Sequence, residues 1–316
     1  MIRIGSRGSA LARWQAEHIA ARLRGLGQEV TITIFVTTGD RVQAAPFQQV
    51  GTKGMFTKEI EEALADDQID LAVHSLKDLP TVLHPSFLLA AIPQRADARD
   101  AFVSTQYESL DHVPQGAILG TSSLRRQALV RSIRPDLDVR ELRGNVDTRL
   151  RKLRERQYDA IVLAAAGLDR LQQIDSVRER FPAERMCPAP GQGALAIECR
   201  AEDEPTRTLL AALDHQPTHF AVIAERAALA RLEGGCQVPI GVYCDAGSTG
   251  WKITGVVARP DGTRVLRDKV EFDADASDLT AAREAGRRIA DRLLESGAAE
   301  MLGLPELAHP AENAPA

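Results

Sequence analysis

A group of polar side chains follows a short apolar run in the first third of the chain. Ile69–Val73 leads directly into the heptapeptide His-Ser-Leu-Lys-Asp-Leu-Pro, which contains Lys77 and Asp78 and ends at Pro80. In open α/β sheets, ligands bind just beyond the carboxyl ends of the strands, so an amine and a carboxylate placed there can act on a substrate. The alternative is a solvated loop with a Lys77–Asp78 ion pair, and the pattern alone does not separate the two.

A tight loop in the last third of the chain presents a cysteine. Gly234 and Gly235 precede Cys236, and Pro239 follows shortly after it. A buried structural cysteine normally lies inside a strand or helix pattern, without such glycine and proline residues around it. The loop therefore indicates a reactive or covalently modified thiol, with a structural cysteine as the alternative. The sequence contains no CxxC pair, which argues against a zinc site; the other cysteines are Cys187, Cys199 and Cys244.

Two predicted strand-to-helix junctions combine glycine, hydroxyl side chains and arginine. The first is Gly5–Ser9, with Arg7 inside it, and the second is Gly120–Arg126, which ends in two arginines. Free backbone N–H groups at a helix start, next to hydroxyls and arginines, bind anions. Neither segment is a Walker A or GxGxxG motif, so a nucleotide is not implied. Helix capping by the serines is the alternative, although capping does not explain an arginine at both junctions.

An arginine-rich segment surrounds the sequence Arg143-Gly144-Asn145. Residues 121–160 contain ten Arg and one Lys against six acidic residues, a local balance of +5 in a chain whose net charge is −5. Arginine offers a planar fork that grips a carboxylate or phosphate with two hydrogen bonds. A strand ending at Arg143 and a helix beginning near Asp147 would place Arg143 and Arg149 at the entrance of the same ligand-binding site. RNA binding is the alternative, but the chain has only 13 aromatic residues to stack on bases, and few lie near this segment.

Length and composition indicate a globular protein of more than one domain. The chain has 316 residues, too many for one comfortable core, which predicts two or three domains. Hydrophobic content of 44% and charged content of 26% are ordinary for a globular protein. No apolar run approaches the roughly 20 residues that span a bilayer. A strand-like pattern starts at Ile2–Ile4 where a signal peptide would lie, so we expect the chain to stay in the cytosol.

Strand and helix patterns alternate over the first 200 residues. Predicted strands cover Ile2–Ile4, Glu29–Thr37, Ile69–Val73, Ala117–Leu119, Val139–Leu142, Ala160–Ala164 and Ala194–Glu198. Predicted helices between them begin near Ser9, Thr57, Ser123 and Asp147. This is the βαβ arrangement typical of parallel sheets. From about residue 216 a helix, a β-hairpin around the Pro-Asp-Gly turn at 260–262 and a long amphipathic helix, Ser277–Glu295, indicate a small α+β domain.

Together these segments resemble the porphobilinogen deaminase (hydroxymethylbilane synthase) family. The similarity runs from Ile2 to about Gly303, in order and without a large insertion. It rests on five segments in register, at 51–56 (GTKGMF), 73–80 (VHSLKDLP), 120–126 (GTSSLRR), 143–146 (RGNV) and 232–239 (LEGGCQVP). The sequence departs from the family's usual residues at Thr52, Leu76 and Leu79. None of these departures removes a functional side chain.

The resemblance implies an α/β fold: two periplasmic-binding-protein-like (type II) α/β domains flanking a cleft, plus a small C-terminal α+β domain. The expected limits are residues 1–95 with about 194–215 for the first domain, 96–193 for the second and 216–304 for the third. Residues 305–316 are rich in Pro and Ala and are expected to form a disordered tail.

The resemblance also implies a reaction. Four porphobilinogens join head to tail with loss of ammonia, and water releases linear hydroxymethylbilane, an intermediate of tetrapyrrole and haem biosynthesis. The product is built on a dipyrromethane cofactor, one per chain, held by a thioether to Cys236. The family suggests a cytosolic monomer that binds no metal, nucleic acid or membrane and passes its product to uroporphyrinogen-III synthase. A non-catalytic small-anion-binding protein of the same two-domain fold is the alternative.

The family's functional positions are matched here by residues of suitable type. Asp78 is the expected catalytic residue, because its carboxylate can stabilise the positive charge left on a pyrrole nitrogen when ammonia departs. The cofactor is expected to bind Cys236, Lys77, Asp78, Ser123, Arg125, Arg126, Gly144 and Asn145. Substrate carboxylates are expected to bind Arg7, Ser9, Arg143, Arg149, Arg170 and Gln192. Residues Gly39–Phe56 are expected to form a mobile lid, to which Lys53 and Lys58 are assigned.

Overall fold

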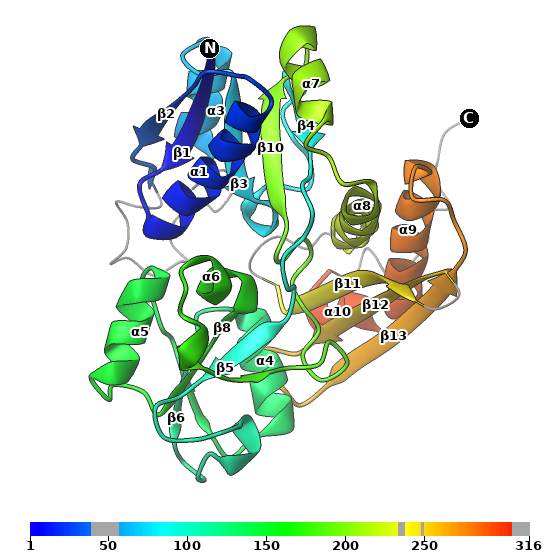
Figure 1. Ribbon diagram of the computed structural model, residues 1–316. Helices are drawn as coiled ribbons and strands as arrows, with labels where there is room; N and C mark the ends of the chain where they lie inside the picture. Colours follow the sequence, from blue (N-terminus) through cyan, green and yellow to red (C-terminus); the bar gives the residue numbers. More distant parts are fainter. Residues whose placement is uncertain (39–56, 233–237, 248–249, 305–316) are drawn as a thin grey trace.

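The computed structural model describes residues 1–38, 57–232, 238–247 and 250–304. In this part of the chain the strands form three separate sheets, two mixed sheets of five strands and one antiparallel sheet of three. Figure 1 shows the first sheet with its helices at the top, the second below it and the third to the right. None of the described helices is both long and apolar enough to cross a membrane.

The first sheet combines N-terminal strands with one strand from much later in the chain. Its order is β2-β1-β3-β10-β4, in which β1 is parallel to β2 and β3, and β10 is antiparallel to β3 and β4. Its strands are β1 (Ile2–Arg7), β2 (Val30–Phe35), β3 (Leu71–Ser75), β4 (Phe87–Ala91) and β10 (Leu195–Arg200). Its helices are α1 (Ala10–Gly25), α3 (Lys58–Ala65) and α7 (Glu204–Ala211). Ile19 and Leu23 of α1 pack into the core of this domain.

The second sheet repeats this arrangement with strands from the middle of the chain. Its order is β7-β6-β8-β5-β9, in which β6 is parallel to β7 and β8, and β5 is antiparallel to β8 and β9. Its strands are β5 (Asp100–Val103), β6 (Ile118–Gly120), β7 (Asp138–Arg140), β8 (Ala160–Ala164) and β9 (Val177–Arg180). Its α-helices are α4 (Leu124–Ile133), α5 (Val146–Arg154) and α6 (Ala165–Arg170), and 3-10 turns lie at η3 (Leu110–His112) and η4 (Ile174–Ser176).

Both sheets have the same strand order. In each sheet one strand runs antiparallel to its neighbours, and this is the first strand after the chain has crossed from the other sheet. The chain crosses between β4 and β5 and returns between β9 and β10. This is the arrangement of the type II periplasmic-binding-protein fold, and it confirms the predicted fold class. The βαβ pattern indicates parallel strands, and β1 with β2 and β3, and β6 with β7 and β8, are parallel, whereas β5 and β10 run antiparallel to their neighbours. The two sheets use residues 2–91 with 195–200, and residues 100–180, which lie inside the predicted domain limits.

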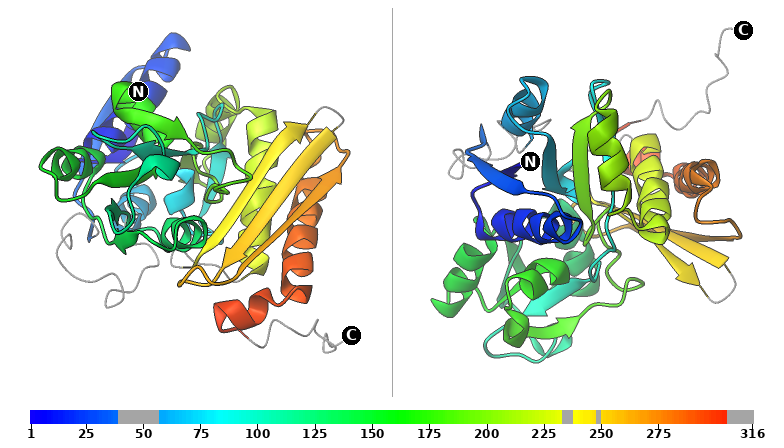
Figure 2. Two further views of the ribbon diagram at one scale, coloured as in Figure 1. Left: turned by 90° about the horizontal axis from the view of Figure 1, so that it is seen from below. Right: turned by 45° about the horizontal axis from the view of Figure 1, so that its top comes forward.

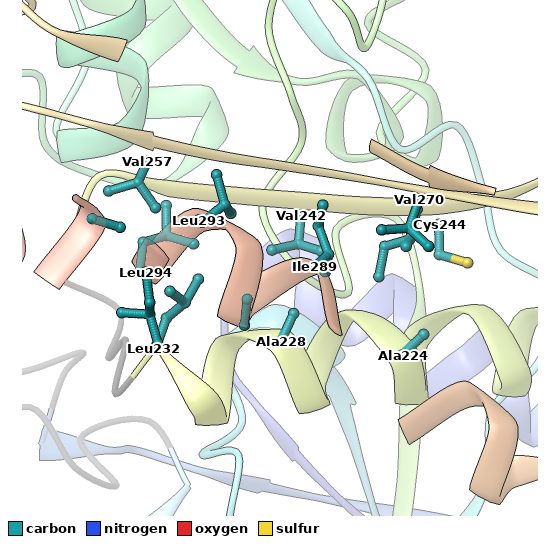
Figure 3. Packing of buried hydrophobic residues seen from close by; sticks show 14 of the residues in the cluster. Ala224, Ala228, Leu232, Val242, Cys244, Val257, Val270, Ile289, Leu293 and Leu294 are labelled. Carbon is teal, nitrogen blue, oxygen red and sulfur yellow. The ribbon is translucent and has the colours of Figure 1, made fainter. Parts of the chain in front are cut away.

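The third sheet is an antiparallel meander of β11 (Ile240–Gly247), β12 (Gly250–Ala258) and β13 (Val265–Phe272). Helices α8 (Gln216–Arg231) and α9 (Leu279–Glu295) pack together on this sheet, and α10 (Ala298–Leu302) follows α9. Figure 2 shows the three strands side by side with α9 next to them. Val242, Ile289 and Leu293 fill the space between sheet and helices, as Figure 3 shows.

A buried ion pair joins the three domains. Arg95, in the first crossing segment, donates to Glu225 of α8 through Nη1 at 2.6 Å and Nη2 at 3.1 Å. Glu225 also accepts hydrogen bonds from the backbone N–H groups of Gly191 at 2.6 Å and Cys244 at 2.9 Å. Gly191 belongs to the second crossing segment and Cys244 to β11, so one carboxylate ties both crossings to the third domain.

Candidate functional site

The carboxyl end of β3 presents Lys77 and Asp78. The strand runs into a single 3-10 turn, η2 (Leu76–Asp78). Leu76 and Leu79 are buried on either side of the two polar residues, and the Leu79 N–H donates to the Leu76 carbonyl at 3.1 Å. Because the leucines anchor the turn in the core, Lys77 is left half-buried and Asp78 exposed.

Lys77 and Asp78 lie within electrostatic range of cations from the second domain. Burial lowers the pKa of Lys77 to about 8; Asp78 opposes this shift and Arg126 adds to it. Among the described residues, no side chain forms a hydrogen bond or an ion pair with the Asp78 carboxylate. The Lys77–Asp78 ion pair of the solvated-loop alternative is therefore not formed.

The start of α4 carries the predicted arginine pair. Ser123 caps the helix, its hydroxyl accepting from the Arg126 N–H at 3.4 Å. Arg125 and Arg126 are only 4% and 5% exposed, and both bind Asp100, the first residue of β5. Arg125 Nη1 lies 2.7 Å from Asp100 Oδ2, and Arg126 Nη2 lies 2.7 Å from Asp100 Oδ1. Burial alone would raise the pKa of Asp100, but the two arginines hold it well below its usual range.

Gln192 belongs to the same buried network. Its amide nitrogen donates to Asp100 Oδ1 at 2.9 Å and to the Ala98 carbonyl at 2.7 Å, and its oxygen accepts from Arg126 at 3.2 Å. Gln192 is 1% exposed, nearly as buried as Arg125 and Arg126, and its contact with a substrate carboxylate stays a prediction. Arg125 Nε is buried and has no hydrogen-bond partner among the described residues, which leaves this network one N–H donor to offer.

Arg149 on α5 joins this group through the loop that precedes its helix. Gly144 has a φ of +113°, and an added Cβ would lie 2.6 Å from Thr148 Cγ2, so only glycine fits. The Gly144 carbonyl accepts from Arg149 Nε at 2.7 Å. Burial lowers the pKa of Arg149 to about 10; Arg126 lowers it further and Asp78 opposes the shift. Arg149 therefore lies within electrostatic range of Arg126 of α4 and Asp78 of η2.

The remaining loop residues occupy the edge of the group. Arg143 forms an ion pair with Glu141, with 2.6 Å between Nη2 and Oε1. Asn145 is exposed and stands at the N-cap of α5 without a side-chain capping bond. Arg170, at the end of α6, donates through Nη2 to the Gly193 carbonyl at 2.7 Å, and burial lowers its pKa to about 10.

Other predicted residues are placed differently or are not described. Ser9 caps α1, its hydroxyl accepting from the Ala12 N–H at 3.2 Å, and Arg7 ends β1 half-buried. Lys58 is exposed on α3, and its Nζ lies 3.8 Å from Glu62 Oε1. Lys53 and Cys236, with the segment 39–56, lie outside the described residues.

This group of side chains can bind a ligand that carries several carboxylates. Lys77, Arg149 and Arg170 are desolvated cations, and no carboxylate of the described residues lies within ion-pair distance of them. Such cations cost free energy until an anion pairs with them. The Asp78 carboxylate can in turn accept N–H donors from the same ligand. The described residues contain no group of His, Cys, Asp and Glu that could hold a metal ion.

Two family models match the chain. Residues 2–208 match the porphobilinogen deaminase dipyromethane cofactor binding domain, and residues 219–295 match the porphobilinogen deaminase C-terminal domain. The chain belongs to the porphobilinogen deaminase family. The matches cover the sheets of all three deaminase domains and support a transferase of tetrapyrrole biosynthesis with a dipyrromethane cofactor and porphobilinogen as substrate.

Solved structures of binding proteins align with about two thirds of the deaminase chain. The methionine binding protein MetQ is 14% identical over 67% of this chain and 89% of its own, with a TM-score of 0.43. A nutrient binding protein from Burkholderia cenocepacia bound to methionine is 14% identical over 66% and 90%, with a TM-score of 0.41. A periplasmic substrate-binding protein of an ABC transporter from Coxiella burnetii is 14% identical over 72% and 97%, with a TM-score of 0.43.

The residues of the deaminase fit a dipyrromethane. Two joined porphobilinogen rings carry four carboxylates and two pyrrole N–H groups. The desolvated Lys77 and the buried, unpartnered Nε of Arg125 offer donors to carboxylates. The exposed Asp78 carboxylate offers acceptors to pyrrole N–H groups.

We expect Arg126→Lys to reduce both stability and turnover. Arg126 donates from Nε and Nη2 to Asp100 and from Nη1 to the Val162 carbonyl, and a single ammonium cannot reproduce this fork. Leaving buried partners unsatisfied should cost about 1–3 kcal/mol in a urea unfolding experiment. Arg151→Lys is the matched control, because Arg151 is exposed and, among the described residues, pairs only with Glu155. Equal unfolding free energies for the two variants would contradict the structural role of Arg126.

We expect substrate binding to weaken as the pH rises through the pKa of Lys77. The folded-state pKa is about 8, below the ordinary value, so Lys77 is an ammonium below this pH and a neutral amine above it. If Lys77 binds a substrate carboxylate, KM for porphobilinogen should rise between about pH 7 and pH 9. Lys77→Arg keeps the charge over this range, so its KM should stay flat. The same rise in both proteins would assign it to another group.

Proposed function

We propose that this chain condenses four porphobilinogens head to tail, with loss of ammonia, into linear hydroxymethylbilane on a dipyrromethane joined to Cys236 by a thioether. The observation that carries the proposal is the Asp78 carboxylate, which has no partner among the described side chains and lies within electrostatic range of the desolvated cations Lys77 and Arg149. The family match supports the same chemistry.

The cations suit a substrate that brings two carboxylates with every ring. Porphobilinogen carries an acetate and a propionate, so negative charge accumulates as the product grows. Arg149 and Arg170 have pKa values of about 10 and therefore remain charged at neutral pH in spite of their burial. A carboxylate that reaches them replaces the water that burial has removed, and the guanidinium fork fixes its orientation.

Asp78 can stabilise the reacting ring. Its carboxylate is exposed and free to accept a pyrrole N–H. When ammonia leaves the substrate, positive charge spreads onto the pyrrole nitrogen, and a carboxylate within hydrogen-bond reach lowers the energy of that state. Lys77, the preceding residue, can bind a substrate carboxylate and so keep the ring nitrogen beside Asp78.

The cofactor is assigned to the inner part of the same group. Lys77, Arg125 and Arg126 would hold its carboxylates, and Asp78 its pyrrole nitrogens. When bound, a dipyrromethane supplies the terminal ring to which the first substrate is joined. Ser123 and Gly144 act by placing arginines, since Ser123 caps the helix that carries Arg125 and Arg126, and Gly144 accepts from Arg149.

The three described cysteines are unsuited to hold the cofactor. Cys187, Cys199 and Cys244 are buried. Burial raises the pKa of Cys187 to about 12 and that of Cys199 to about 11, and burial together with Glu225 raises that of Cys244. Because the thiolate is the nucleophile, these thiols stay unreactive at neutral pH. This leaves Cys236 as the attachment point.

The proposal extends to the setting of the protein. We assign it to the cytoplasm as a monomer that passes its product to uroporphyrinogen-III synthase. Light scattering of the purified protein at working concentration tests this part, and a dimer mass would contradict it.

Intact-mass spectrometry of freshly purified, active protein tests the central proposal. We expect the chain mass plus two porphobilinogens less two ammonias. Brief exposure to porphobilinogen should then add masses in steps of one porphobilinogen less one ammonia. A bare chain mass in active protein would contradict a covalent cofactor. A non-catalytic anion-binding protein would bind porphobilinogen and gain no mass.

A further inference from the structure

Arg170 is held in place by two neutral groups. Its Nη2 donates to the Gly193 carbonyl at 2.7 Å, and its guanidinium carbon lies 5.6 Å from the centre of the Trp14 ring. A carbonyl and an aromatic face both attract a cation, yet neither carries a formal charge. The guanidinium therefore keeps its full positive charge although burial lowers its pKa to about 10.

The nearest acid in sequence does not neutralise Arg170. Asp169 is bound to Arg180, with 3.0 Å from Oδ2 to Nη1 and 2.6 Å from Oδ1 to Nη2. Arg125 and Arg126, in contrast, share the buried carboxylate of Asp100. Arg170 thus differs from the α4 arginines in being fixed without a counter-ion among the described residues.

The aromatic ring comes from the opposite domain. Trp14 lies on α1 of the first domain and Arg170 on α6 of the second, and Figure 1 shows these helices facing each other where the two domains meet. A Cβ added at Gly167 of α6 would lie 3.8 Å from Leu11 of α1, so the helices are in van der Waals reach. Trp14 itself is stacked on His18 one turn later, with centroids 5.0 Å apart and planes at 7°.

We propose that Trp14 is a positioning residue that holds the Arg170 guanidinium across the domain boundary, charged and oriented for a substrate carboxylate. This inference rests on the proposed function, in which Arg170 binds a carboxylate of porphobilinogen or of the growing product. An acidic residue in place of the ring would hold the guanidinium equally well but would compete with that carboxylate.

A double-mutant cycle of Trp14→Leu and Arg170→Gln tests the proposal through the kinetics with porphobilinogen. Loss of the ring should raise KM about 3- to 10-fold, with a smaller change in kcat. Arg170→Gln should have a larger effect, and the double variant should equal Arg170→Gln alone, because Trp14 acts through Arg170. Trp14→Phe should fall between wild type and Trp14→Leu. Effects that multiply in the double variant would overturn the proposal.

Trp251→Phe is the matched control. Trp251 is the other tryptophan of the chain and packs against Phe220 in the core of the third domain, 4.4 Å between ring centroids. Trp251→Phe should leave KM unchanged. In the double variant with Arg170→Gln, the fold-change in KM should equal the product of the two single fold-changes. A KM increase equal to that of Trp14→Leu would assign both effects to general loss of packing and overturn the proposal.

Unfolding measurements separate this inference from the proposed function. A wild-type protein with no turnover of porphobilinogen would contradict the proposed function alone. The same four proteins of the cycle would still report on the contact, since Trp14→Leu loses the stacking on His18 in both backgrounds but should lower the urea midpoint of wild type more than that of Arg170→Gln. Equal midpoint shifts in both backgrounds would show that the ring does not hold the guanidinium.

Discussion

Replacing Cys236 by serine should abolish turnover and leave the chain at its unmodified mass. A thiolate is a soft, strong nucleophile near neutral pH, whereas a serine hydroxyl stays protonated and reacts poorly without a general base. The sequence pattern of two glycines before Cys236 and a proline after it predicts a loop suited to present such a group. Without the attached dipyrromethane, the first porphobilinogen has no ring to join. Intact mass and a product assay on the same sample measure both consequences.

Cys199→Ala provides the control for this experiment. Cys199 is buried in β10, and burial raises the pKa of its thiol to about 11, so it should contribute only packing. The variant should carry the added mass and turn over normally, with a modest loss of stability. A Cys236→Ser protein that still carries the added mass would show that another residue holds the cofactor.

Local signals in the sequence were sufficient to predict the helix starts and strand ends that form the site. Ser9 and Ser123 were predicted at helix N-termini, and both cap their helices. The apolar run before Lys77 and Asp78 is a strand, β3, and η2 follows it directly. These features depend on residues within a few positions of one another, which is why periodicity and capping patterns identify them.

Long-range pairing could not be predicted in the same way. Strands β4, β5 and β9 have only four or five residues, and β5 is buried throughout, so none shows an alternating pattern. Their places between or beside other strands are set by pairing across the two crossings, and no local signal marks the antiparallel direction of β5 and β10. Helix α7 and strand β11 were missed as well.

Asp100 is the main residue of the site that the sequence did not identify. It lies 25 residues before Arg125, and nothing in its own neighbourhood marks the two arginines as its partners. A weak signal existed, since Asp100 opens the apolar run 101–103, and a carboxylate in a buried strand requires a cation. Gln192, which the sequence predicts as a substrate contact, also donates to Asp100 in this network.

Asp78→Asn should reduce turnover far more than it reduces stability. The substitution keeps the size and shape of the side chain and removes its negative charge. If the carboxylate stabilises positive charge on the reacting pyrrole, turnover should fall by about 10²–10³-fold, as when other preorganised electrostatic partners are removed. Asp78 is exposed and has no hydrogen bond or ion pair with a described side chain, so the folded state loses little. Single-turnover kinetics beside urea unfolding measure the two effects.

Asp78→Glu separates the charge from its position. It keeps the carboxylate but moves it by one methylene, so turnover should lie between those of wild type and Asp78→Asn. In Asp78→Asn the amide oxygen can still accept a hydrogen bond from the pyrrole N–H. For this variant KM should therefore change less than kcat. The expected order of turnover is Asp, then Glu, then Asn. Near-normal turnover with Asn at this position would mean that the negative charge is not needed, and the role proposed for Asp78 would have to be abandoned.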